Sequence, residues 1–163
     1  MIVRDARPDE LRAIGDLRVA AYQADGFLSA TSRYAPTLRA LGTNGEGEIL
    51  VAEAAGQLAG TVMLQLTGHQ SPLITGPDEA EIRALAVAQA ARGRGTGRAL
   101  LTAVIARAAQ RGVRHLVLCT QIEMLAAQRL YHQAGFRRLA DRDWSPAPGV
   151  TLISYGLLLP SRG

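Results

Sequence analysis

The stretch Arg92-Gly93-Arg94-Gly95-Thr96-Gly97-Arg98 joins a predicted strand, Glu79–Val87, to a predicted amphipathic helix, Gly97–Arg111. Glycines let a backbone approach a ligand closely and adopt conformations that other residues avoid. Successive free N–H groups and the positive end of the following helix then face an anion, and the three arginines add positive charge around it. The stretch therefore predicts a site for a phosphate or a pyrophosphate.

The spacing excludes two common phosphate motifs. A P-loop needs a lysine after its last glycine, and the chain contains no lysine. The dinucleotide fingerprint starting at Gly93 needs a glycine or alanine at position 98, which is Arg98. That fingerprint also belongs to an early βαβ unit, whereas this loop follows a predicted antiparallel hairpin of Glu48–Ala54 and Leu58–Thr67. A merely flexible turn does not need three glycines interleaved with three arginines.

The composition indicates one globular domain over residues 1–163. Hydrophobic residues make up 48% of the chain and charged residues 20%, so a core is available and general disorder is disfavoured. The chain has no run of eighteen apolar residues, and its first eight residues lack the apolar region of a signal peptide. Cys119 is the single cysteine, so no internal disulfide can form and a reducing, cytoplasmic location is predicted.

The net charge of +4 comes from arginines that are spread along the chain. Aromatic residues are only 4% of the sequence, so platforms for stacking nucleic-acid bases are scarce. We therefore expect neither a nucleic acid nor a membrane as a partner. The local excess of arginine inside the glycine loop is better explained by a small anionic ligand.

Outside the loop, the hydrophobic pattern predicts alternating helices and strands in a mixed α/β (α+β-like) fold. Pro36 is predicted to interrupt the second helix. Glycine and proline also predict a loop before the strand Glu79–Val87 and a Pro-rich turn before the last strand. The predicted strands are Ile2–Arg4, Arg114–Thr120, Phe136–Ala140 and Val150–Leu159; the helices are 8–23, Thr31–Leu41 and Glu123–Ala134; the loop is Gly68–Asp78 and the turn Asp143–Gly149.

Two motifs resemble those of the GNAT family of N-acetyltransferases. Arg92, Gly95 and Gly97 match the family signature [Q/R]-x-x-G-x-[G/A], and the stretch from Ala127 to Phe136 is similar to A-x-x-L-Y-x-x-x-G-F. The inferred order of elements agrees along essentially the whole chain. The resemblance implies a GNAT-type central mixed, mostly antiparallel sheet of six to seven strands, flanked by about four helices.

The resemblance also implies acetyl-coenzyme A (acetyl-CoA) as co-substrate. The loop amides would wrap its pyrophosphate, at Arg92, Gly93, Arg94, Gly95, Thr96, Gly97 and Arg98. The preceding strand would splay from its neighbour after Leu85, and its backbone at Leu85, Ala86 and Val87 would hold the pantetheine arm as a further strand would be held. The Leu85 amide would polarise the thioester carbonyl.

Two side chains carry the catalytic roles that the resemblance implies. Glu81 stands where several relatives have a general base, although a solvent-facing carboxylate, or one paired with Arg83 or with a neighbouring strand, is an equal alternative. Asp78 and Glu79 are weaker substitutes. Tyr131 corresponds to the usual general acid, since a phenol is protonated at neutral pH; the alternative is a half-buried aromatic. Met124 replaces an asparagine that is frequent in the family.

We thus expect an acetyl-CoA-dependent N-acetyltransferase that acts by direct attack of a primary amine in a ternary complex. The alternative is a non-catalytic acyl-CoA-binding regulatory module.

The spacing of the histidines predicts no metal site, and Cys119 is expected to pack in the core. The acceptor, and the choice between a homodimer and a monomer, stay open. An acidic mouth would form if five carboxylates converged, namely Asp78, Glu79, Glu81, Asp141 and Asp143. By analogy alone, Tyr22, Phe27, Tyr34 and His69 fall in acceptor-site regions.

Overall fold

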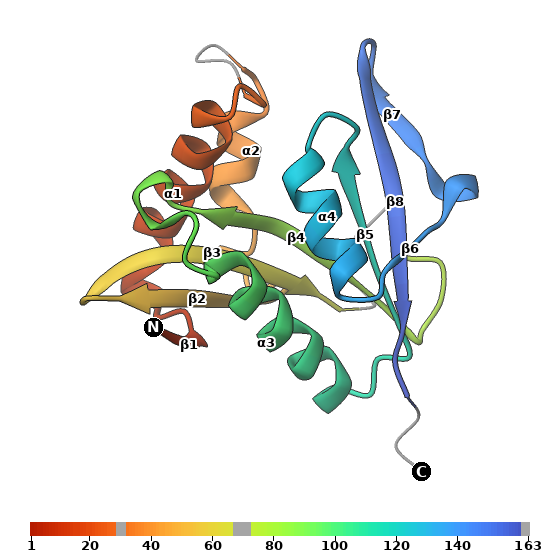
Figure 1. The fold of residues 1–163 in the computed structure, drawn as a ribbon, viewed down its shortest axis with the longest axis horizontal. Helices are drawn as coiled ribbons and strands as arrows, with labels where there is room; N and C mark the ends of the chain where they lie inside the picture. Colours follow the sequence, from red (N-terminus) through yellow and green to blue (C-terminus); the bar gives the residue numbers. More distant parts are fainter. Residues whose placement is uncertain (29–31, 67–72, 161–163) are drawn as a thin grey trace. The chain divides into compact units, whose positions relative to one another are not determined.

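The computed structural model describes residues 1–28, 32–66 and 73–160. Figure 1 shows its helices and strands, which alternate along the chain. The strands are β1 Ile2–Asp5, β2 Glu48–Ala54, β3 Gln57–Gln65, β4 Glu79–Val87, β5 His115–Gln121, β6 Arg137–Arg138, β7 Trp144–Ala147 and β8 Val150–Leu158. The helices are α1 Leu11–Ala24, α2 Ala35–Ala40, α3 Thr96–Gln110 and α4 Leu125–Gln133, with short 3-10 turns at Pro8–Glu10, Gln89–Ala91 and Ala140–Arg142.

The chain forms two compact units, and β4 and α3 each begin in one unit and end in the other. The first unit contains residues Met1–Leu64 and Ala84–Val104, and the second contains Gln65–Arg83 and Ile105–Gly163. Each unit is described by itself below. That the whole chain folds as one domain stays a prediction.

In the first unit, β1, β2 and β3 form an antiparallel sheet. The β2–β3 hairpin closes through Ala55 and Gly56, whose φ angles of +53° and +76° are those of a type I′ turn. Alternate apolar residues of these strands pack with α1 in a core cluster of Ile14, Ile49, Val51 and Met63. The hairpin and the helix were predicted from alternation and helical spacing, and both are confirmed.

Helices α1 and α2 of the first unit pack on each other through a second core cluster, formed by Val19, Leu28 and Leu38. The Arg18 guanidinium is buried between them and donates to the carbonyl oxygens of Leu38 at 3.2 Å and Leu41 at 2.7 Å. These carbonyls lie at the end of α2, where a helix leaves acceptors unsatisfied. Pro36 does not interrupt the helix as predicted, because it lies in the first turn, where no N–H is needed.

In the second unit, the start of β4 pairs with β5 in parallel. The other strand pairs whose register is given for the described residues are antiparallel. Strand β8 is antiparallel to β5, and both β6 and β7 pair with β8. The strand order is β1-β2-β3-β4-β5-β8-β6, with β7 on β8. The predicted mixed, mostly antiparallel sheet with about four helices is confirmed.

Among the described residues the sheet has eight strands instead of the expected six to seven. The additional strand is β7, so the prediction that residues 143–149 form only a turn is wrong. Pro146 lies inside β7, and proline is tolerated there because an edge strand leaves one row of N–H groups unpaired. The predicted strand over residues 136–140 is reduced to the two residues of β6.

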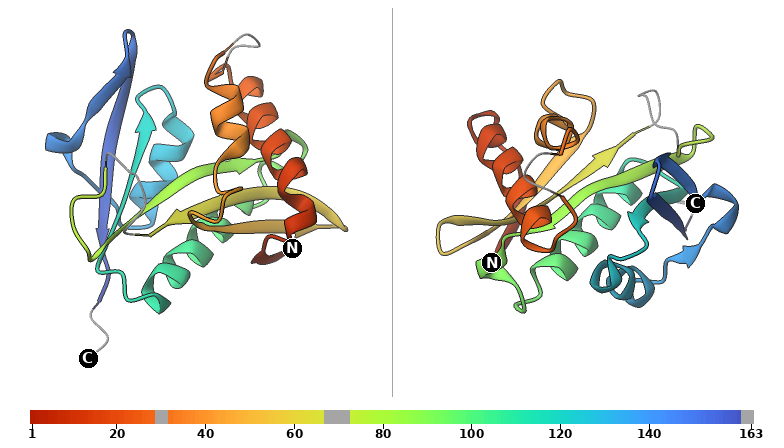
Figure 2. Two further views of the ribbon diagram at one scale, coloured as in Figure 1. Left: turned by 180° about the vertical axis from the view of Figure 1, so that it is seen from behind. Right: turned by 90° about the horizontal axis from the view of Figure 1, so that it is seen from above.

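The strands of the second unit present two faces with different side chains. Glu81 pairs with Val117 in β5, so these two side chains point to one face. Leu118 pairs with Tyr155, and both point to the other face. Tyr131 of α4 packs on Tyr155, with ring centroids 6.0 Å apart, and the two views in Figure 2 place α4 alongside β5. Helix α4 therefore covers the face opposite to Glu81.

Candidate active site

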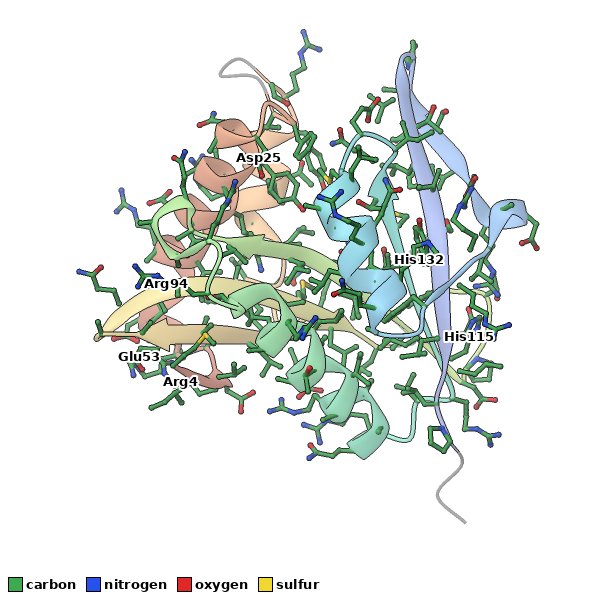
Figure 3. The ribbon with its side chains drawn as sticks, in the orientation of Figure 1. Arg4, Asp25, Glu53, Arg94, His115 and His132 are labelled. Atoms are coloured by element: carbon green, nitrogen blue, oxygen red, sulfur yellow. The ribbon has the colours of Figure 1, made fainter. Side chains whose placement is uncertain are left out.

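The glycine loop adopts the conformation that an anion site requires. Gly93 and Gly95 have φ angles of +77° and +78°, which other residues rarely adopt. The Ala99 N–H donates to the Gly95 carbonyl at 3.0 Å and so begins the hydrogen bonding of α3. N–H groups before that point belong to the helix start, where they lack partners within the helix. Arg94 lies in this exposed loop (Figure 3), and the geometry suits a pyrophosphate.

The Arg92 side chain contacts other parts of the first unit. Its guanidinium forms an ion pair with Asp25 and donates to the carbonyl oxygens of Ala21 at 3.3 Å and Val87 at 3.4 Å. Its backbone N–H donates to Gln89 at 3.4 Å. The Arg92 side chain thus ties the loop to the end of α1 and to β4, and it positions the loop amides.

Two small residues, Thr96 and Gly60, allow the loop and the start of α3 to pack closely on the sheet. Thr96 is only 4% exposed, and its hydroxyl donates to the Ala91 carbonyl at 3.4 Å. Gly60 of β3 lies where an added Cβ would come 2.8 Å from the Ala86 oxygen and 2.8 Å from Leu100 of α3. The pattern predicted a strand at Gly60 but did not indicate this close approach, since the alternation of a strand says nothing of what packs upon it.

Replacing Gly60 by Val should destabilise the first unit and weaken acetyl-CoA binding together, because the backbone of β4 or the start of α3 must move. Overpacking of this kind costs about 1–3 kcal/mol. Urea unfolding and calorimetric titration of acetyl-CoA measure the two effects. Gly76→Ala is the control, since a Cβ there meets no atom within 4 Å. Full stability and affinity in Gly60→Val would contradict the packing described here.

Strand β4 changes conformation just before the residues expected to hold the pantetheine arm. Its registered pairing with β5 runs from Glu79 to Glu81, and Ala84 has a φ angle of +53°. A non-glycine residue in this region is uncommon and interrupts the regular alternation of a strand. The pairing therefore ends before Leu85, earlier than the predicted splay after that residue.

Glu81 is buried, with 5% of its surface exposed, so the solvent-facing alternative is wrong. Its carboxylate lies 3.9 Å from the Arg83 Nε, which agrees with the alternative of a pair with Arg83. That distance is too long for a hydrogen bond, so the contact with Arg83 is an ion pair.

Tyr131 is buried, with 6% of its surface exposed, whereas the alternative interpretation expected a half-buried aromatic residue. Its ring packs against Phe136 at 5.8 Å and Tyr155 at 6.0 Å between centroids. Helix α4 ends at Gln133, Gly135 after it has a φ angle of +96°, and the Phe136 N–H donates to the Tyr131 carbonyl at 3.0 Å. These contacts fix the direction of the Tyr131 ring.

The junction before α4 is held by a residue that sequence reasoning missed. The Gln128 amide donates to the carbonyl oxygens of Gln121 at 3.3 Å and Ile122 at 3.0 Å. Met124 lies next to this junction, and its sulfur accepts from the Thr120 hydroxyl at 3.3 Å. Gln128 therefore ties the start of α4 to the end of β5.

Glu79 is a structural carboxylate and not a spare base. It accepts from the Arg142 guanidinium at 2.9 and 2.8 Å, from Thr75 N–H at 2.9 Å, and from His115 Nδ1 at 2.7 Å. Burial by itself would raise the pKa of Glu79, but the hydrogen bonds from Arg142, Thr75 and His115 outweigh it and lower the pKa from 4.5 to about 2.

This network should appear as acid sensitivity of the fold. The folded pKa of Glu79 lies below the ordinary value, so its stabilisation is present above about pH 4.5 and is lost as the pH falls toward about 2. One pKa unit corresponds to about 1.4 kcal/mol. Urea unfolding between pH 5 and 2 should show a smaller loss of stability in Glu79→Gln than in the wild type. Equal slopes would contradict this assignment.

Three of the five carboxylates whose convergence would form an acidic mouth have arginine neighbours. Asp143 binds the Arg138 guanidinium at 2.9 and 2.7 Å and accepts from the Ser154 N–H at 2.8 Å. Glu79 is paired with Arg142, and Glu81 lies near Arg83. Glu79 and Asp143 are thus each bound by an arginine, and Glu81 has Arg83 near it, so these three do not form a cluster of free carboxylates that would attract a polycation.

The remaining candidates have ordinary surroundings. Burial, and next the charge of Glu81, raise the pKa of the Cys119 thiol to about 11, so it is protonated at neutral pH and is a poor nucleophile. Tyr155 and Phe136 are buried, whereas Trp144 is 37% exposed. Within residues 1–28, 32–66 and 73–160 we find no group of side chains suited to a metal ion, and no helix combines the length and apolarity needed to cross a membrane. His69 lies outside the described residues.

Comparison with known proteins agrees with this geometry. Residues 11–136 match the Acetyltransferase (GNAT) family. Mycothiol acetyltransferase of Cellulomonas flavigena is 37% identical over 102 residues, which are 61% of this chain and 29% of that protein. The matched part thus spans less than a third of that relative.

Solved structures share the fold at low sequence identity. An acetyltransferase of the GNAT family from Staphylococcus aureus Mu50 has a TM-score of 0.76 at 17% identity, covering 98% of this chain and 99% of that one. The putative acetyltransferase yncA of Salmonella typhimurium, solved with acetyl-CoA, has a TM-score of 0.74 at 20% identity and covers 98% and 94%.

The loop with its left-handed glycines opens α3 directly after β4, whose registered pairing with β5 ends at Glu81. The chain belongs to the acetyltransferase (GNAT) family. The resemblance stated from the two sequence motifs is thereby confirmed, and acetyl-CoA-dependent N-acetylation is the general reaction of this class.

Proposed function

We propose that this protein binds acetyl-CoA and transfers its acetyl group to a primary amine by direct attack in a ternary complex. The observation that carries the proposal is the loop of residues 92–98, where Gly93 and Gly95 take left-handed φ angles at the start of α3. Amides arranged in this way bind phosphates. The family match and the acetyl-CoA complex of a structural neighbour support the identity of the ligand.

In this proposal the loop amides of residues 93–98 hold the pyrophosphate and Arg92 holds the loop in place. The backbone of Leu85, Ala86 and Val87 binds the pantetheine arm, and the Leu85 N–H polarises the thioester carbonyl. The positive φ angle of Ala84 supports a separate role for Leu85, Ala86 and Val87, because it separates them from the start of β4, which pairs regularly with β5.

Glu81 acts as the general base and Tyr131 as the general acid. An ammonium group must lose a proton before it can attack a thioester, and Glu81 accepts that proton directly or through water. The departing thiolate takes a proton from the Tyr131 hydroxyl. The two side chains come from opposite faces of the second unit, and in this proposal each serves a different atom, Glu81 the attacking amine nitrogen and Tyr131 the departing sulfur.

Calorimetric titration with acetyl-CoA, followed by measurement of free CoA thiol in the presence of an amine panel, tests the proposal. We expect binding and amine-dependent release of CoA. Binding without transfer to any amine would favour a regulatory acyl-CoA-binding module, and the absence of binding would refute both.

A reducing, cytoplasmic location, proposed from the single cysteine, can be checked by fractionation.

A further inference from the structure

Glu81 and Arg83 lie on the same face of β4 and carry opposite charges. They are two residues apart in a strand, so their side chains project from the same side. The Arg83 Nε is 3.9 Å from the Glu81 carboxylate, and the Arg83 side chain is 26% exposed. The candidate base therefore has a partly exposed guanidinium as its immediate neighbour.

The Arg83 guanidinium has remaining capacity for an anion. Its Nη1 donates to the Gln65 side-chain oxygen at 3.0 Å, and its Nε faces Glu81 at a distance beyond a normal hydrogen bond. Among the described residues, Nη2 has no acceptor. A guanidinium held by one neighbour, with a second nitrogen available, is suited to bind a carboxylate through its planar fork.

Resting on the proposed function, we infer that the acceptor is a zwitterionic amine of the α-amino acid type, whose amine meets Glu81 and whose carboxylate binds Arg83. The amine and the carboxyl carbon of an α-amino acid are two bonds apart, and the opposite charges of Glu81 and Arg83 are similarly close. A ligand that carries both charges next to each other complements this pair.

The charges around the pair disfavour other amines. Glu79 and Asp143 are each closely paired with an arginine, so these two carboxylates are not available to bind the further cations of a polyamine. A peptide N-terminus lacks the carboxylate, because its carboxyl group is an amide. Neither of these supplies a carboxylate to the Arg83 guanidinium, and a polyamine would also place a further cation near it.

Matched pairs of L-amino acids and their carboxamides test the inference, for example methionine with methioninamide and phenylalanine with phenylalaninamide. Each is assayed by CoA release, with spermidine as a third kind of amine. Calorimetry of the amino acids against the CoA-saturated protein gives a readout independent of turnover. The variants are Arg83→Gln and Arg83→Lys, and Arg129→Gln on the exposed surface of α4 is the matched control. Thermal unfolding checks that each variant is folded.

We expect kcat/KM about tenfold or more higher for the acids than for the amides, the contribution of a charged hydrogen-bonded pair. Arg83→Gln should remove this preference mainly through KM and abolish amino acid binding, Arg83→Lys should keep part of it, and Arg129→Gln should behave as the wild type. Equal use of amides, a preference for spermidine, or a preference that survives in Arg83→Gln would overturn the inference alone. Acetyl-CoA binding without acetylation of any amine would overturn the proposed function, and this inference with it.

Discussion

Replacing Gly95 by Val is expected to lower the affinity for acetyl-CoA by about 100-fold. A φ angle of +78° is strained for a side chain with a Cβ, at a cost of about 1–2 kcal/mol. Moving the loop to relieve that strain also loses amide hydrogen bonds to a charged phosphate, each worth about 1.5–3 kcal/mol. Calorimetric titration of acetyl-CoA against both proteins measures the difference.

The chain offers a matched control for Gly95→Val. Gly45 also has a left-handed φ angle, +81°, and a Cβ at either position meets no atom within 4 Å. Gly45→Val therefore imposes a similar strain on the same unit without touching the loop. It should reduce stability but leave the affinity near that of the wild type. Equal losses of affinity in the two variants would mean that strain, and not the loop, decides binding.

Replacing Tyr131 by Phe is expected to reduce kcat by about 100-fold, the lower end of the usual contribution of general acid–base catalysis. The ring contacts with Phe136 and Tyr155 do not require the hydroxyl, so stability and the KM for acetyl-CoA should change little. Glu81→Gln should give a comparable loss, because it removes the base and keeps the shape of the side chain. Steady-state kinetics at saturating acetyl-CoA measure both.

Tyr155→Phe is the control for the loss of a hydroxyl in the same aromatic cluster. Tyr155 is 2% exposed and packs on Tyr131, yet it has no part in the proposed proton transfers. Its variant should keep nearly full kcat. If Tyr131→Phe were as active as Tyr155→Phe, the leaving thiolate would need no proton from Tyr131, and the assignment of the general acid would be wrong.

The sequence determined the candidate site where the chemistry depends on neighbours along the chain. The glycine loop and the following helix are local, since a positive φ angle, a helix start and three nearby arginines need no distant partner. The β4 boundaries, Glu79–Val87, agree with the prediction for the same reason, because hydrophobic and glycine signals bound that strand on both sides. The motif around Tyr131 is likewise contained in one helix and its glycine cap.

Only the tertiary structure decided which charged side chains remain available for chemistry. Arg92 is engaged by Asp25 and Glu79 by Arg142, partners that lie 67 and 63 residues away in the chain. Sequence spacing carries no information about such pairs, because they are set by how strands and turns come together. The same holds for β7, which exists because β8 offers an edge. Local signals thus specified the loop that would hold the phosphates and placed Arg83 two residues from Glu81, while long-range packing decided that Arg92 and Glu79 are engaged by distant partners.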